Sequence, residues 1–183
     1  LQRVEANRNF ANKLWNATRL VINAIEHVPA KPPRRPRPTL ADRWILARRE
    51  DLKREVARLF EASQYGEAGR QIYEFFWSEF ADWYLEIAKL QIESGRGRAW
   101  STVDTMISIL GDCLRLLHPF TPFVTEELWQ HLRAVCRQGG RAFGPRRGWE
   151  EALIVARWPE PEGETAGGAQ AMEDFGLVQA VVT

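Results

Sequence analysis

The feature of this sequence that most limits its fold is the recurrence of apolar residues every three or four positions. Between residues 4 and 28 the spacings are 4, 3, 4, 4 and 3, at Phe10, Leu14, Ala17, Val21, Ile25 and Val28. Because an α-helix turns by about 100° per residue, these side chains form one stripe along a helix. A helix with one apolar stripe must pack against other elements, so this segment belongs to a shared core.

The same periodicity predicts four further helices, over residues 39–58, 65–92, 106–117 and 121–132. Thr39 and Asp42 have the spacing of a capping box, and Thr121 before Pro122 is typical of an N-cap followed by a first helical residue. Seven of the twelve residues from 73 to 84 are aromatic. That is too many for one stripe, so we expect the third of the five helices to be covered on more than one side.

The end of the chain differs from the rest. Residues 153–158, LIVARW, form the only segment with strand character, and a last short helix is expected from about Ala169. We therefore predict an all-α helical bundle with one short extended segment near 153–158. The bundle is expected to span residues 1–161, and residues 162–183 to form an acidic linker and the start of a helix leading to a C-terminal region that this chain lacks. Leu1 is expected to be a cut inside a longer chain.

Charge is unevenly distributed along the chain. The formal net charge is only +1, yet residues 1–58 carry 14 basic and 6 acidic side chains, whereas residues 150–183 carry 1 and 7. Arg outnumbers Lys 21 to 4. Arg suits bidentate contacts with phosphate and base edges, but a GC-rich genome produces the same bias, so both explanations stay open. If a nucleic acid binds, we expect residues 1–58, helped by Arg141, Arg146 and Arg147, to supply most phosphate contacts.

Several classes of protein are excluded. The longest purely aliphatic stretch, residues 152–156, is far shorter than the roughly 18 apolar residues of a membrane span, and no signal segment is visible. Cys113 and Cys136 are too few for a disulfide framework or a structural zinc site. We expect a cytoplasmic protein with reduced thiols, no membrane partner and a monomeric state.

Enzyme signatures are mostly absent, since the sequence has no glycine-rich phosphate loop, no G-x-S-x-G and no H-E-x-x-H. Glu127 and His131, four residues apart, have the spacing of two metal ligands, but without a third ligand nearby an ordinary surface pair is favoured. His118 is better explained by a helix C-terminus than by a general base, and Trp129 is expected to pack inward. No catalytic residue and no metal site are predicted.

Two groups of residues suit nucleic-acid binding. Asn9, Lys13, Asn16 and Leu20 form a second stripe on the first helix, about 100° from the apolar one. Its amides, ammonium and apolar platform suit the unstacked bases of single-stranded RNA. The alternative is a solvated helix face with one exposed Leu.

The second group lies on the third helix. Asp82 and Glu86 are like charges four residues apart, which is unfavourable unless a cation or an amino group lies between them. A Glu carboxylate can accept a hydrogen bond from the exocyclic amine of cytosine or adenine. The alternative is a surface ion pair between Glu86 and Lys89, and the spacing alone does not choose.

Five motifs in order resemble the anticodon-binding domain of bacterial valyl-tRNA synthetases: RNFANKLWNATRLV at 8–21, LADRWIL at 40–46, YEFFWSEFADWYLEIAK at 73–89, LLHPFTPFVTEELWQ at 116–130 and VARWPEP at 155–161. The resemblance covers about residues 4–161. It implies a helical bundle that follows a Rossmann catalytic domain and precedes a coiled coil. The ATP-handling HIGH and KMSKS motifs of that family are not in these 183 residues. The resemblance therefore implies a tRNA-binding fragment without catalysis or cofactor, ATP being bound by the catalytic domain.

The resemblance also implies which residues contact the anticodon of valine tRNA: Lys13, Leu20, Leu85 and Glu86. Arg8, Asn9 and Asn16 are added as neighbouring tRNA contacts on the first helix. Some relatives have Phe where this chain has Leu20, which would replace stacking by a weaker apolar contact. Two alternatives remain, the same domain of an isoleucyl-tRNA synthetase and a helical protein-interaction module with basic loops.

Overall fold

The computed structural model describes residues 2–32, 38–95, 98–138, 143–144, 148–163 and 165–182. Throughout these ranges the regular structure is helical, without a strand, which confirms the all-α prediction. The elements are α1 (Gln2–Glu26), α2 (Leu40–Glu61), α3 (Tyr65–Glu74), η1 (Phe75–Tyr84), α4 (Leu85–Glu93), α5 (Ala99–Leu117), α6 (Pro122–Arg137), η3 (Leu153–Val155) and α7 (Gly168–Val182).

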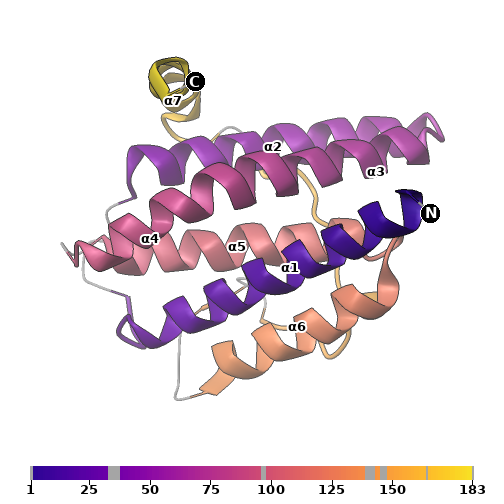
Figure 1. Ribbon diagram of the computed structural model, residues 1–183, viewed down its shortest axis with the longest axis horizontal. Coiled ribbons are helices and arrows are strands. Elements are labelled where there is room, and N and C mark those ends of the chain that lie inside the picture. The colour runs from indigo at the N-terminus through magenta and orange to yellow at the C-terminus, as the bar shows by residue number, and fades with distance from the viewer. Residues whose placement is uncertain are drawn as a thin grey trace.

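Helix α5 is the centre of the bundle. It contacts α1, α2, α3, α4 and α6, and most of its side chains are buried. α3, η1 and α4 form one continuous rod beside α2, while α1 lies between this rod and α6 (Figure 1). α7 packs against the start of α2, where the Phe175 and Trp44 rings stack with centroids 3.9 Å apart. None of the described helices is long and apolar enough to cross a membrane.

The periodicity predicts one uniform α-helix over residues 65–92. The rod over residues 65–93 differs from that prediction. Residues 75–84 form a π-helical segment, η1, in which the backbone is widened by bonds from residue i to i+5. The widening spreads the aromatic residues round the rod. Phe76, Phe80 and Tyr84 are fully buried, whereas Tyr73 just before η1 is 38% exposed. The rod packs against α1, α2 and α5, which confirms coverage on more than one side.

The expected capping box at the start of α2 is confirmed. The Thr39 N–H donates to Asp42 Oδ2 at 2.7 Å, and the Asp42 N–H donates to Thr39 Oγ1 at 3.1 Å. The remaining Asp42 oxygen accepts from the Tyr84 hydroxyl at 2.7 Å. Burial and the nearby Asp42 charge raise the pKa of Tyr84 well above its ordinary value. The box therefore ties the beginning of α2 to the end of η1.

The start of α6 is confirmed at Thr121 and Pro122, but without the side-chain cap that the pattern predicts. Thr121 Oγ1 instead donates to the Leu117 carbonyl oxygen of α5, 3.3 Å away. His118 is bound locally, with its Nδ1 2.9 Å from Thr125 Oγ1. Trp129 is fully buried, which confirms that it packs inward. The hydroxyls and the imidazole thus hold the α5–α6 turn.

The prediction of an extended segment at 153–158 is wrong. Residues 153–155 form the 3₁₀ turn η3, and Ile154 and Val155 are 81% and 68% exposed. A strand requires a partner edge, and the described residues offer none. Leu153 is buried instead, and its N–H donates to Glu126 Oε2 at 2.8 Å, so a helix side chain satisfies the backbone that a strand would have paired.

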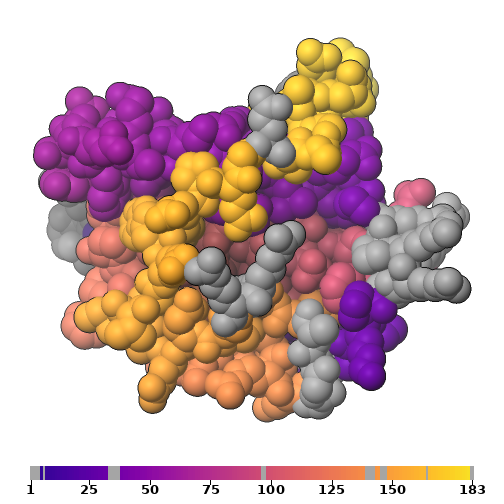
Figure 2. Space-filling view, turned by 180° about the vertical axis from the view of Figure 1, so that it is seen from behind, coloured from indigo at the N-terminus to yellow at the C-terminus, as the bar shows by residue number. Residues whose placement is uncertain are grey.

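Residues 149–163 cross the side of the bundle opposite α1 and lead towards α7 (Figure 2). Trp129 Nε1 donates to the Glu150 carbonyl oxygen at 3.3 Å at one end of this segment. At the other end the Glu162 N–H donates to Glu50 Oε2 at 2.8 Å. Both ends of the segment are therefore fixed to helices, and the predicted domain boundary at residue 161 stays a prediction.

Glu50 belongs to a buried ion cluster between α2 and α5. Lys53 Nζ lies 3.1 Å from Glu50 Oε1 and 3.0 Å from Asp112 Oδ2, and Arg49 and Arg115 also pair with these carboxylates. Burial opposes ionisation of Glu50, but the Glu162 N–H and the two α2 cations together hold its pKa below the ordinary value. Each of these charges has several partners, which offset the free-energy cost of burying it.

Candidate nucleic-acid interface

The polar stripe of α1 lies on the outside of the bundle. Asn9 and Asn16 are exposed, and the Arg8 side chain is 70% exposed, 3.9 Å from Glu5. Leu20 is only partly buried and packs against the edge of the core. These four predicted contacts are thus accessible, in full or in part, from one side of α1.

Lys13 is held by two groups from the rod. Its ammonium pairs with the Asp82 carboxylate and lies 4.2 Å from the centroid of the Trp77 ring. Its side chain keeps 24% of its exposure, and that of Asp82 keeps 52%. A cation over an indole face is attracted by the ring's negative quadrupole. The like charges of Asp82 and Glu86 predict a nearby cation. That cation is Lys13, and it pairs with Asp82.

The π-helical segment explains how both groups reach Lys13. Trp77 and Asp82 are five residues apart, which in an α-helix places them about 140° apart on the wheel. A π-helix is wider and turns by a smaller angle per residue, so the two side chains come closer to the same side of the rod. The change in helix type therefore builds this part of the site.

Glu86 lies one turn beyond Asp82 at the start of α4. Its Oε1 accepts from Lys89 Nζ at 2.7 Å, so the surface pair that the spacing allowed is present. The Glu86 side chain is still 61% exposed, and a carboxylate has acceptor sites beyond the one that Lys89 uses. The ion pair and a base contact are thus compatible in geometry.

Leu85 has a different position from the other predicted contacts. It is only 3% exposed and belongs to the core between α4 and its neighbours. Little of its side chain is available to a partner in this conformation, and its role as a tRNA contact stays a prediction.

Trp77 and Tyr73 also belong to the site, although the sequence motifs do not predict them there. The Tyr73 and Trp77 rings stack with centroids 5.5 Å apart, beside Phe10 of α1. They form an aromatic surface under and next to the Lys13 ammonium. The available signal was the excess of aromatic residues over one stripe, which requires some of them to lie near the surface.

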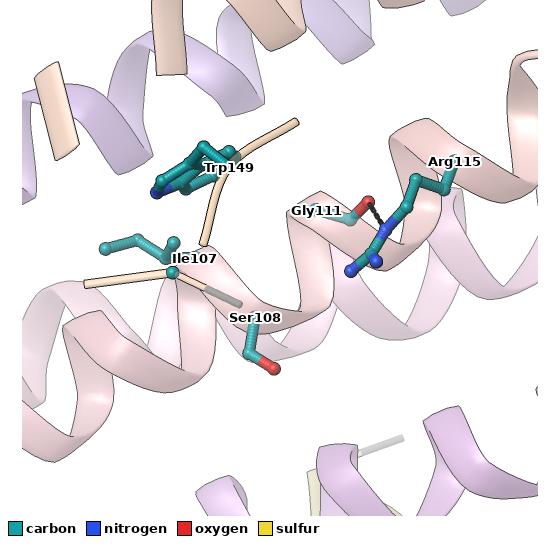
Figure 3. Close-up of a pocket in the computed structure, with 6 residues that line it drawn as sticks. Ile107, Ser108, Gly111, Arg115 and Trp149 are labelled. Carbon is teal, nitrogen blue, oxygen red and sulfur yellow. Dashed lines mark hydrogen bonds between the residues drawn. The ribbon is translucent and has the colours of Figure 1, made fainter. Parts of the chain in front are cut away.

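Two hollows lie away from the polar stripe of α1 among the described residues. The larger one, of about 250 Å³, lies between α2 and the rod, and its charged lining is mostly carboxylate, whereas the smaller one lies beside α5. A cavity of about 40 Å³ next to α5 is lined by Ile107, Ser108, Gly111, Arg115, Gly144 and Trp149 (Figure 3). Its polar groups are already bound within the protein: Arg115 Nε donates to the Gly111 carbonyl oxygen at 3.2 Å, and Ser108 accepts from Arg49 at 2.6 Å. The cavity has room for only a few water molecules.

Potential metal ligands are scattered. His131 Nε2 lies 3.0 Å from Glu127 Oε1 as an exposed pair on α6. Within the described ranges no three His, Cys, Asp or Glu side chains come together as a metal site would require. The basic residues expected to reach phosphate at positions 34, 35, 37, 141, 146 and 147 lie outside the described residues.

Comparison with known proteins identifies the family to which this fold belongs. Residues 42–183 match the family described as the anticodon-binding domain of tRNA ligase. A valine-tRNA ligase of Dehalococcoides mccartyi is 40% identical over 180 residues, which is 98% of this chain and 19% of the relative. The corresponding enzyme of Thermus thermophilus is 39% identical over 181 residues, 99% of this chain and 18% of the relative.

A third relative, the valine-tRNA ligase of Bacillus licheniformis, is 36% identical over 183 residues, 99% of this chain and 19% of the relative. The chain therefore spans about a fifth of the length of the curated relatives it matches. From the family match and the fold together, this chain belongs to the anticodon-binding domains of tRNA ligases.

Proposed function

We propose that this chain is the anticodon-reading part of a valine-tRNA ligase, that it binds tRNA as a monomer, and that it catalyses no step itself. Valine and ATP would be bound by parts of the parent protein outside these 183 residues. The family match and the valine-tRNA ligase relatives support this proposal. The chain would select among tRNAs, because a wrong anticodon would leave polar or charged groups of the protein unpaired.

The observation that carries the proposal is the exposed Glu86 carboxylate on α4, one turn beyond the Asp82 that pairs with Lys13 of α1. Valine anticodons end in A and C, and both bases carry an exocyclic amine. The Glu86 carboxylate can accept from such an amine, whereas guanine and uracil present a carbonyl oxygen there, which the carboxylate repels. Tyr73 and Trp77 offer rings on which an unstacked base can lie.

The test is a competition between valine tRNA and a variant whose last anticodon base is changed from C to U. This change replaces an amine by a carbonyl and also makes the anticodon resemble that of isoleucine tRNA. The wild-type chain should prefer the valine sequence. Glu86→Gln keeps the size of the side chain but removes the charge, so discrimination should fall by about 1 to 3 kcal/mol.

The matched control is Glu55→Gln. Glu55 pairs with a cation three residues later, Arg58, as Glu86 pairs with Lys89, but it lies on α2. It should leave discrimination unchanged. If Glu86→Gln also leaves it unchanged, Glu86 is only the partner of Lys89 and the anticodon is read elsewhere. If the wild-type chain binds no tRNA, the protein-interaction alternative replaces this proposal, and a preference for the U variant would favour an isoleucyl enzyme.

A further inference from the structure

On the side of α1 that faces away from the core, acidic residues occur only at the two ends, Glu5 and Glu26, and not in the middle. Between residues 6 and 25 the sequence contains three basic residues and five asparagines, but neither Asp nor Glu. The residues opposite the apolar stripe follow each other at spacings of 4, 4, 3 and 4 and are all exposed: Arg8, Asn12, Asn16, Arg19 and Asn23. We call these five residues the α1 outer face. It shares Asn16 with the stripe that carries Lys13, so the two surfaces are continuous.

Arg19 is the charged residue of the α1 outer face that has no ion-pair partner among the described residues. Among the described residues it has no ion-pair or hydrogen-bond partner for its side chain, whereas Lys13 is paired with Asp82. Of the carboxylates near α1, Asp82 pairs with Lys13 and Glu5 pairs with Arg8. Arg19 therefore presents a positive charge in the middle of this face, where α1 carries no carboxylate.

The outer surface of α2 and α3 has the opposite character. Four of its arginines pair with carboxylates: Arg48 with Glu79, Arg54 with Asp51, Arg58 with Glu55, and Arg70 with Glu67 and Glu74. The groove between these helices is lined by four carboxylates and one arginine among its charged side chains. A phosphate would have to displace a carboxylate from each of these arginines, so this surface disfavours a polyanion although it is rich in Arg.

We infer that the sugar-phosphate backbone of the bound tRNA lies along the α1 outer face, with Arg19 contacting a phosphate and Asn12 and Asn23 donating amide hydrogen bonds to phosphate or ribose oxygens. This inference rests on the proposed function and adds to it a site that holds the RNA without reading its sequence. Contacts with phosphate and sugar fix the register of a nucleic acid, whereas base contacts select it. The α1 outer face thus presents the anticodon to Lys13 and Glu86.

The experiment measures binding of the 183-residue chain to an RNA hairpin carrying the anticodon stem and loop of valine tRNA, at several salt concentrations. Arg19→Gln should lower affinity about three- to tenfold, equally for the valine hairpin and its C-to-U variant. It should also reduce the slope of log affinity against log salt by about 0.7 to 0.9, the contribution of one phosphate. Asn12→Asp places a carboxylate on the same face and should weaken binding in the same sequence-independent way.

The matched control is Arg54→Gln, which removes an exposed arginine that is paired with Asp51 on α2. Affinity and salt slope should stay at the wild-type values. If the wild-type chain binds but Arg19→Gln matches Arg54→Gln, the RNA does not follow α1 and only this inference falls. A loss restricted to the valine hairpin would make Arg19 a base contact and overturn its assignment to the backbone. Absence of wild-type binding would overturn the proposed function, and this inference with it.

Discussion

Polar groups on two sides of the bundle differ in whether they have partners within the protein. On the side crossed by residues 149–163 the protein satisfies its own groups: Trp129 binds the Glu150 carbonyl oxygen, Glu126 binds the Leu153 N–H, and Glu50 binds the Glu162 N–H. On the α1 outer face, within the described part of the chain, the amides and Arg19 have no side-chain partner in the protein. The first side is built for stability, whereas the second leaves its hydrogen-bonding capacity to another molecule.

The comparison predicts separable effects. Changes on the crossed side should lower the free energy of unfolding and leave RNA selectivity intact, because they remove contacts within the protein. Changes on the α1 side should affect RNA binding and leave stability nearly intact, because exposed groups and exposed ion pairs contribute little to folding.

Trp129→Ala should have the largest effect. The indole is fully buried and lies in an edge-to-face contact with Trp149, with centroids 4.7 Å apart, so the substitution leaves a large cavity. We expect the free energy of unfolding to fall by about 3 to 5 kcal/mol. Urea denaturation measures this, and RNA binding per folded molecule should be unchanged. A variant as stable as the parent but unable to bind RNA would contradict the division between the two sides.

Asp104 on α5 is an exception, because its carboxylate is partly buried. Burial raises its pKa to about 6 from the ordinary 3.8. The folded state then holds the proton more tightly than the unfolded state. The contribution of Asp104 to stability is therefore highest below its pKa in the unfolded chain. It falls as the pH rises through its pKa in the folded protein, and it stays reduced above that pH.

Asp104→Asn should remove that pH dependence. At neutral pH the variant should be more stable than the parent by about 1 to 3 kcal/mol, because it never ionises. At low pH, where the parent carboxyl is protonated in both states, the two proteins should converge. Urea midpoints measured across this pH range provide the check. Parallel curves for both proteins would show that Asp104 ionises in the fold as it does in water.

Lys13→Ala should have the smallest effect on folding. The Asp82 partner is half-exposed, so loss of the ion pair and of the Trp77 contact should lower the free energy of unfolding by about 1 kcal/mol or less. Because Lys13 and Asp82 neutralise each other, removing Lys13 should change selectivity among anticodons more than the salt slope. A salt slope lowered as much as by Arg19→Gln would instead identify Lys13 as a phosphate contact.

The sequence determined the helices and their partly exposed faces. The apolar stripe of α1 is buried as predicted, and the capping box of Thr39 and Asp42 forms as its spacing requires, because helix periodicity and capping are local. For the candidate site, the sequence predicted which side of α1 the residues occupy. Asn9, Lys13 and Asn16 lie on an accessible side of α1 because that position follows from the helix repeat alone.

Only the tertiary structure decided the features that depend on residues distant in sequence. The partner of Lys13 is Asp82 and not Glu86, and Trp77 joins them because η1 is π-helical. Residues 153–155 turn instead of extending, since no strand edge in the described part is available and Glu126 satisfies their backbone. Leu85 is buried although its motif suggested contact with RNA. Local pattern fixes which side of a helix a residue occupies, whereas packing decides what lies opposite that side.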